Sequence, residues 1–148
     1  AREHIEAAAE AAYQRAEIAQ ETIQYRLAWQ HAQRAAQLMP DKSRYLNLAG
    51  FIADILGQYD KAIEYFKLAL ASDLNTYGED HPDVARDRNN LGGAYQALGQ
   101  YDKAIEYYQL ALASDLNTYG EDHPYVKKVQ DNLDSAKSAK SPLDYKKD

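Results

Sequence analysis

The chain contains an internal duplication, in which the block 57–98 recurs as the block 99–140. Residues 57–82 and 99–124 differ only at Phe66/Tyr108 and Lys67/Gln109, and a weaker similarity continues to the ends of the two blocks. A fixed period of roughly 20–50 residues is typical of proteins that stack copies of one supersecondary unit. Chance does not produce this match, so the duplication restricts the chain to a repeat architecture.

Each block reads as two helices joined by a tight turn. Apolar residues recur every three or four positions in 84–98 and again in 101–113, which predicts two amphipathic helices. Gly99 suits the left-handed conformation that ends the first helix. In the joint between blocks, Gly78 ends a helix and Pro82 suits the first turn of the next one. No segment alternates with period two for long enough to predict a strand.

The residues at the turns and helix contacts resemble the tetratricopeptide repeat. The matching positions are Leu91, Gly92, Tyr95, Gly99, Tyr101, Ala104, Tyr108 and Ala111, and in the preceding block Gly50, Gly57, Tyr59, Ala62, Phe66 and Ala69. The preceding block departs from the pattern at Ala49 and Ala53, and Leu74 and Leu116 replace the closing proline. The longer second helix and the Gly-x-Asp-His-Pro joint are similar to the 42-residue repeats of kinesin light chains.

The repeat and this resemblance imply an all-α fold, a right-handed superhelical solenoid of antiparallel helix pairs with a C-terminal capping helix. We predict one domain over 1–140, followed by a disordered tail. Its parts are a degenerate repeat at 9–42, repeats at 43–84 and 85–126, a capping helix at 127–140, and the tail at 141–148. In the degenerate repeat, 3–20 and 24–38 read as a helix pair, with one long bent helix as the alternative.

Composition excludes several classes of function. The net charge is −6 with no basic run, which argues against nucleic-acid binding, and the absence of cysteine excludes disulfides and thiol catalysis. No apolar run approaches the roughly 18 residues that a membrane span needs. We expect a cytoplasmic location, and the start at Ala1 without methionine suggests a processed or excised piece.

No pattern in the chain indicates catalysis or a bound metal. An enzyme would need a nucleophile beside a base or converging carboxylates, and no such set occurs. His81 and His123 each follow a Glu-Asp pair, but they mark equivalent joints one full repeat apart, so we interpret them as structural. We therefore predict a protein that is not an enzyme and binds neither a cofactor nor a metal.

The predicted binding surface lies on the first helix of each repeat, which lines the concave side of a solenoid. Cations recur there once in every repeat, asparagines form a second ladder, and two apolar residues would make a side-chain pocket. The proposed peptide-binding residues are Arg44, Asn47, Leu48, Phe51, Arg86, Asn89, Asn90, Lys128 and Asn132. Only Asn90 and Lys128 match the carboxylate clamp of chaperone-tail binders in the family, so that ligand is not favoured.

These features predict a non-catalytic protein–protein interaction scaffold or adaptor that binds an extended, acidic peptide with one bulky apolar residue. The alternatives are self-assembly through the alanine-rich helices 5–20 and 28–38, or a regulatory domain excised from a larger signalling protein. We also expect Gly92 to face Ala104, and Gly50 to face Ala62, with no side chain between the helices.

Overall fold

The computed structural model describes residues 1–21 and 24–140. Within these residues there are seven helices and no strand, so the predicted all-α fold of helix pairs is confirmed. The helices are α1 Arg2–Glu21, α2 Tyr25–Leu38, α3 Ser43–Ile55, α4 Tyr59–Tyr77, α5 Pro82–Leu98, α6 Tyr101–Tyr119 and α7 Pro124–Lys140. Residues 22–23 and the predicted disordered tail, 141–148, lie outside the described residues.

The chain divides into two compact units, Ala1–Ser72 and Asp73–Asp148, and α4 contributes to both. The repeat boundaries predicted at 43, 85 and 127 remain a prediction from the sequence. The helices begin close to them: α3 starts at Ser43, whereas α5 starts at Pro82, shortly before the predicted boundary at 85.

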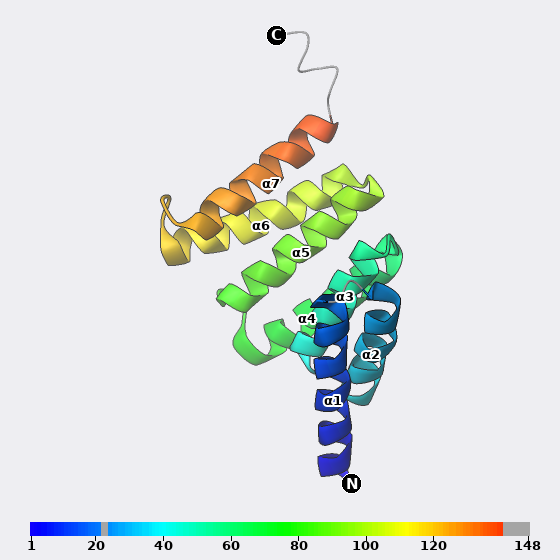
Figure 1. Ribbon diagram of the computed structural model, residues 1–148. Coiled ribbons are helices and arrows are strands. Elements are labelled where there is room, and N and C mark those ends of the chain that lie inside the picture. Colours follow the sequence, from blue (N-terminus) through cyan, green and yellow to red (C-terminus); the bar gives the residue numbers. More distant parts are fainter. Residues whose placement is uncertain (22–23, 141–148) are drawn as a thin grey trace, which may run out of the picture. The chain divides into compact units, whose positions relative to one another are not determined.

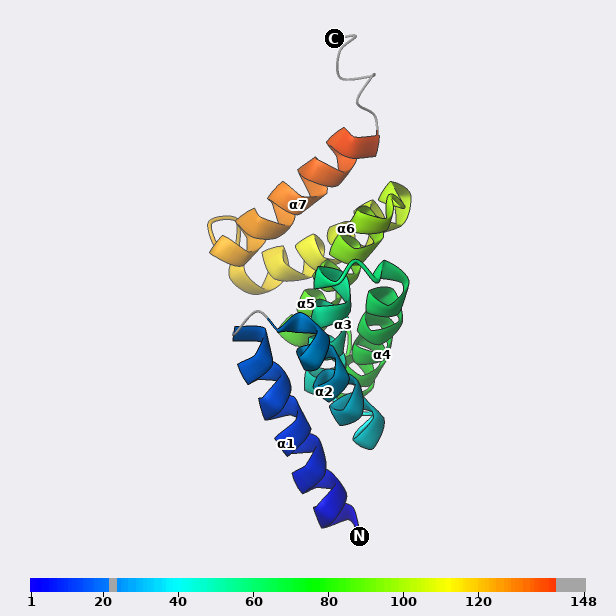
Figure 2. The ribbon, with the colours of Figure 1, turned by 45° about the vertical axis from the view of Figure 1, so that its right-hand side comes forward.

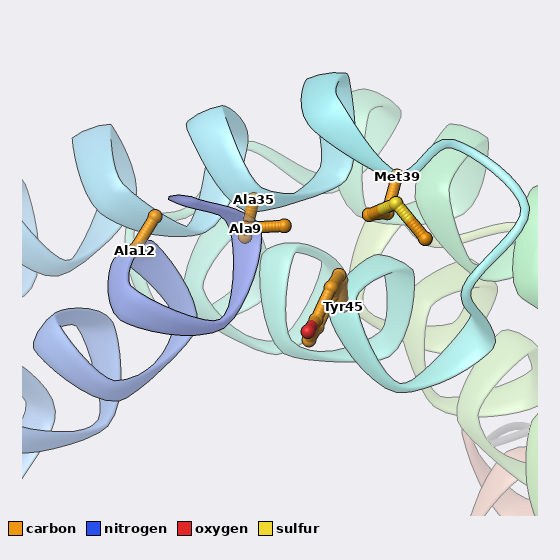
Figure 3. Packing of buried hydrophobic residues seen from close by; sticks show 5 residues of the cluster. All are labelled: Ala9, Ala12, Ala35, Met39 and Tyr45. Atoms are coloured by element: carbon orange, nitrogen blue, oxygen red, sulfur yellow. The ribbon is translucent and has the colours of Figure 1, made fainter. Parts of the chain in front are cut away.

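In the N-terminal unit, α1 and α2 lie side by side in opposite directions (Figures 1 and 2). The alternative of one long bent helix is therefore not what this region adopts. Small side chains let the two helices approach closely. Three of them, Ala9, Ala12 and Ala35, form a buried cluster with Met39, which directly follows α2, and with Tyr45 of α3 (Figure 3). The alanines of the two helices that are at most 1% exposed are Ala9, Ala12, Ala16, Ala28, Ala32 and Ala35.

The burial of these alanines bears on self-assembly. Most of the small-residue face that suggested a second copy as partner is already covered within the N-terminal unit, whereas Ala7 is exposed and Ala8 and Ala11 are partly buried. The buried alanines therefore give little support to self-assembly, which stays a prediction.

In the C-terminal unit, α5 packs against α6, and α6 against α7 (Figure 1). The turn after α5 has the predicted form: Gly99 has a φ of 86°, and the Gln100 N–H donates to the Tyr95 carbonyl at 2.9 Å. On α7 the buried residues Val126, Val129, Leu133 and Ala136 form one stripe, and Lys137 is exposed. This one-sided stripe is what a capping helix requires.

The prediction that Gly92 faces Ala104, and Gly50 faces Ala62, is wrong about the residue that each glycine contacts. A Cβ at Gly92 would lie 2.5 Å from the ring of Tyr108, and a Cβ at Gly50 would lie 2.5 Å from the ring of Phe66. The space that each glycine leaves is thus filled by an aromatic ring from the second helix. Ala62 and Ala104 are fully buried, but they are not the groups that require glycine.

Candidate functional site

A cavity of about 340 Å³ lies in the C-terminal unit, between α5, the end of α6 and the start of α7. It contains both signs of charge, an amide, two aromatic rings and an apolar edge. The lining residues are Pro82, Asp83, Arg86, Asn89, Asp115, Tyr119, Tyr125, Lys128 and Val129. Three predicted site residues, Arg86, Asn89 and Lys128, therefore meet in one place.

The repeated joint positions these side chains. His81 Nδ1 accepts a hydrogen bond from the Asp83 N–H at 3.1 Å, and His123 Nδ1 accepts one from the Tyr125 N–H at 3.1 Å. Each imidazole also stacks on the tyrosine that closes the preceding helix, with ring centroids 4.0 Å apart for Tyr77–His81 and 4.2 Å for Tyr119–His123. The histidines thus act as N-caps that fix where α5 and α7 begin.

Arg86 is half-exposed and surrounded by carboxylates. Its guanidinium lies 3.7 Å from Asp73, 3.6 Å from Asp83 and 3.6 Å from Asp87. The Asp73 side chain is 3% exposed and that of Asp87 is fully buried. Much of the positive charge of Arg86 is therefore already balanced by the protein.

Lys128 differs from Arg86 in this respect. It is exposed at the cavity, and no carboxylate among residues 1–21 and 24–140 lies within ion-pair distance of its ammonium group. On the same side of α7, Asn132 Nδ2 donates to Asn89 Oδ1 at 3.1 Å, which leaves the Asn89 amide N–H groups for other acceptors. Lys128 and Asn89 are thus the groups best placed to bind a carboxylate.

Asp115 was missed by the sequence analysis. It is only 7% exposed, yet it lines the cavity. Burial raises the pKa of its carboxyl, an effect that the nearby His123 partly opposes. It continues the buried stripe of α6 after Ala104, Tyr108 and Ala111, and a carboxylate in such a stripe is the signal that could have identified it.

In the N-terminal unit, Arg44 is engaged within the protein. Its Nη2 donates to both carboxylate oxygens of Glu10, at 2.8 and 3.0 Å, and its guanidinium lies 4.2 Å from the centroid of the Tyr13 ring. The Tyr45 hydroxyl donates to Glu10 as well, at 2.7 Å. Burial and this hydrogen bond raise the pKa of Tyr45 to about 12.

The other predicted residues of this unit differ in accessibility. Asn47 and Leu48 are buried, whereas Phe51 is 44% exposed and contacts Phe66 edge-on, with ring centroids 5.5 Å apart. Of the two residues predicted to form a side-chain pocket, Leu48 and Phe51, only Phe51 is accessible. In the C-terminal unit, the Asn90 Nδ2 is buried and has no hydrogen-bond partner among the described residues.

The described residues contain no group of three or more histidine, cysteine, aspartate or glutamate side chains that could hold a metal ion. Within the same residues, no helix is both long enough and apolar enough to cross a membrane.

The helix pairs, their glycine–aromatic contacts and their repeated capped joints define an all-α repeat protein. The tetratricopeptide-repeat family model matches residues 41–117 and 88–133, more than half of the chain. The chain therefore belongs to the tetratricopeptide-repeat family, as its motifs predicted. This family is a non-catalytic protein-interaction fold.

Solved structures share this fold at low sequence identity. The nearly identical TPR-like repeats of a putative kinesin light chain from Podosopora anserina match with a TM-score of 0.78 and 21% identity, over 93% of this chain and 69% of that one. The TPR2B domain of yeast Sti1, in a pHsp70 complex, matches with 0.74 and 15%, over 88% and 97%.

The type III secretion chaperone SycD of Yersinia enterocolitica, in complex with a peptide of the translocator YopD, matches with a TM-score of 0.72 and 21% identity. This match covers 88% of the chain and 93% of SycD. No curated protein matches the chain in sequence.

Proposed function

We propose that the chain is a non-catalytic interaction scaffold whose C-terminal unit binds an extended, carboxylate-bearing peptide segment. The observation that carries this proposal is the meeting of Arg86, Asn89 and Lys128 in one cavity. Arg86 of α5 and Lys128 of α7 occupy equivalent positions of the repeat. The amides of Asn89, also on α5, and Asn132, also on α7, are joined by a hydrogen bond.

The charges around the cavity indicate which group attracts the ligand. Arg86 has three carboxylates within 3.7 Å, so its net attraction for another anion is reduced. Lys128 has no such partner among the described residues and remains exposed. We therefore assign the main contact with a ligand carboxylate to Lys128, with Asn89 as a hydrogen-bond donor beside it.

The size of the cavity limits what enters it. Its volume of about 340 Å³ is near the lower end of the range of about 300–1,000 Å³ that is usual for small-ligand pockets. It suits one or two side chains of a peptide, and the remaining segment would run over the exposed surface. Affinity in the micromolar range is expected, because exposed charge pairs contribute little individually.

Two of the similar structures support a peptide as the class of ligand. One is the TPR2B domain of Sti1 in complex with pHsp70, and the other is SycD in complex with a YopD peptide. Because both are less than 25% identical to this chain, they support a shared fold and not a shared ligand. The proposed ligand chemistry therefore rests on the cavity of this chain.

The proposal is tested with a fluorescein-labelled, glutamate-rich peptide that contains one tryptophan, titrated by fluorescence anisotropy. Lys128→Glu should weaken binding about tenfold, since it replaces attraction by repulsion at the contact. Lys127→Glu is the matched control. It makes the same charge change at the preceding position of α7, which is exposed and does not line the cavity.

Replacing the glutamates of the peptide by glutamine should weaken binding by a similar factor. Equal affinity of the wild type and both lysine variants would contradict the proposal, as would a glutamine peptide that binds as tightly as the glutamate peptide. Sedimentation velocity over a wide concentration range tests the self-assembly alternative, which predicts a concentration-dependent oligomer.

A further inference from the structure

The cavity contains a buried carboxylate that the contact with an acidic ligand does not use. Asp115 is 7% exposed and lines the cavity, and within the described part of the chain its carboxylate forms no hydrogen bond or ion pair. The charge of nearby His123 only partly offsets the effect of burial, which raises the pKa of the Asp115 carboxyl. A carboxylate that is largely removed from water and has no hydrogen-bonded cation is unfavourable in its charged form. Because Asp115 opens onto the cavity, a ligand that enters the cavity can supply the missing partner.

The preceding repeat shows which partner this position takes within the protein. Asp73 is the equivalent of Asp115 one repeat earlier, and its side chain is 3% exposed. There the guanidinium of Arg86 lies 3.7 Å from the carboxylate. The residue equivalent to Arg86 in the next repeat is Lys128, whose ammonium group forms no ion pair with Asp115. Asp115 is thus the same carboxylate as Asp73 in the next repeat, but without the neighbouring guanidinium that Asp73 has.

The surroundings of Asp115 also change between the two repeats. Asp83 of the first joint is replaced by Tyr125 in the second, so a second acid gives way to an aromatic ring. Tyr125 lies edge-on to Tyr119, with ring centroids 5.4 Å apart, and both rings line the cavity. Aromatic faces attract cations, and they stack well on the flat guanidinium group.

We propose that the bound peptide carries an arginine whose guanidinium occupies this cavity, donating to Asp115 beside the rings of Tyr119 and Tyr125. Acidic residues that flank the arginine then meet Lys128 and Asn89 at the rim. The ligand is accordingly a segment of mixed charge, one arginine between acidic residues. This inference rests on the proposed function and specifies the ligand of the same site.

An arginine fits this position better than a metal ion. A single buried carboxylate offers too few oxygen ligands for a divalent cation, and the described residues show no group of metal-binding side chains. A guanidinium has five donors in a planar fork, so it can bond Asp115 and stack at the same time.

Two fluorescein-labelled peptides test the inference, both with glutamates on each side of one central residue. The central residue is arginine in the first and glutamine in the second. The wild type should bind the arginine peptide about tenfold more tightly, as expected for a charge-assisted hydrogen bond to a shielded carboxylate. In the Asp115→Asn variant this preference should disappear.

Asp131→Asn is the matched control, because it removes one exposed carboxylate of α7 that does not line the cavity. It should keep the tenfold preference. A wild type without preference for arginine, or a preference that survives in Asp115→Asn, would overturn the inference.

These outcomes are separate from those of the proposed function. If both peptides bind equally and Lys128→Glu weakens both, the acidic contact stands and the arginine contact is wrong. If Lys128→Glu has no effect on either peptide, the proposed function itself fails. A further readout is carboxyl NMR of Asp115, whose pKa should fall when the arginine peptide is added.

Discussion

At the scale of single residues, the two joint histidines cap helices through the ring nitrogen Nδ1, which accepts a backbone hydrogen bond. His81→Ala removes both the bond from the Asp83 N–H and the stacking on Tyr77. We expect a loss of about 0.5–2 kcal/mol in the free energy of unfolding, measured by urea titration. His81→Asn restores an acceptor at the cap and should recover most of the loss. If the alanine and asparagine variants were equally stable, the capping interpretation would be wrong.

Asp115 gives a residue-scale prediction for pH. Burial raises its pKa in the folded state above the ordinary value of 3.8, so the folded protein holds this proton more tightly than the unfolded chain. As the pH rises above 3.8, the unfolded chain ionises first, and the contribution of Asp115 to stability falls.

Asp115→Asn should therefore be more stable than the wild type at pH 7, and the difference should shrink as the pH falls toward 3.8. Urea titrations at several pH values measure it. Asp131→Asn, at an exposed position, should show no such trend. If the gain in the free energy of unfolding of Asp115→Asn stayed constant with pH, the raised pKa of Asp115 would not be its cause.

At the scale of elements, the pairing of α5 with α6 depends on one of two adjacent glycines. A Cβ at Gly92 would lie 2.5 Å from the Tyr108 ring, whereas at Gly93 the nearest atom is the Tyr108 hydroxyl at 3.7 Å. Gly92→Ala should cost about 1–3 kcal/mol through overpacking. Gly93→Ala should be neutral, or should stabilise by up to about 1 kcal/mol, because alanine is the better helix former. Thermal melts of both variants decide, and equal melting temperatures would refute the packing account.

At the scale of the whole molecule, the net charge of −6 opposes the local attraction of Lys128 for an acidic ligand. Long-range repulsion is screened first as salt is added, so the association rate of the glutamate-rich peptide should rise between about 10 and 150 mM NaCl. The dissociation rate should rise too, because the local contact weakens. Stopped-flow anisotropy separates the two rates. An association rate that falls with salt would show that cations dominate the approach.

The sequence by itself determined the fold of this protein. A fixed repeat period, helical spacing of apolar residues, and glycine or proline at each turn are local signals, and the helices begin and end within a few residues of where these signals lie. The same signals placed Arg86, Asn89 and Lys128 on corresponding faces of α5 and α7, because helices of one repeat period present equivalent positions alike.

The tertiary structure alone decided which side chains remain accessible to a ligand. Arg44 meets Glu10, which lies far earlier in the chain, and the ring against Gly92 comes from Tyr108 on the next helix. Such contacts depend on how two helices are rotated and spaced, which local periodicity does not encode. The exposed Lys128 and the buried Asp115 belong to one cavity for the same reason: three helices place them there, and no single segment of sequence contains that geometry.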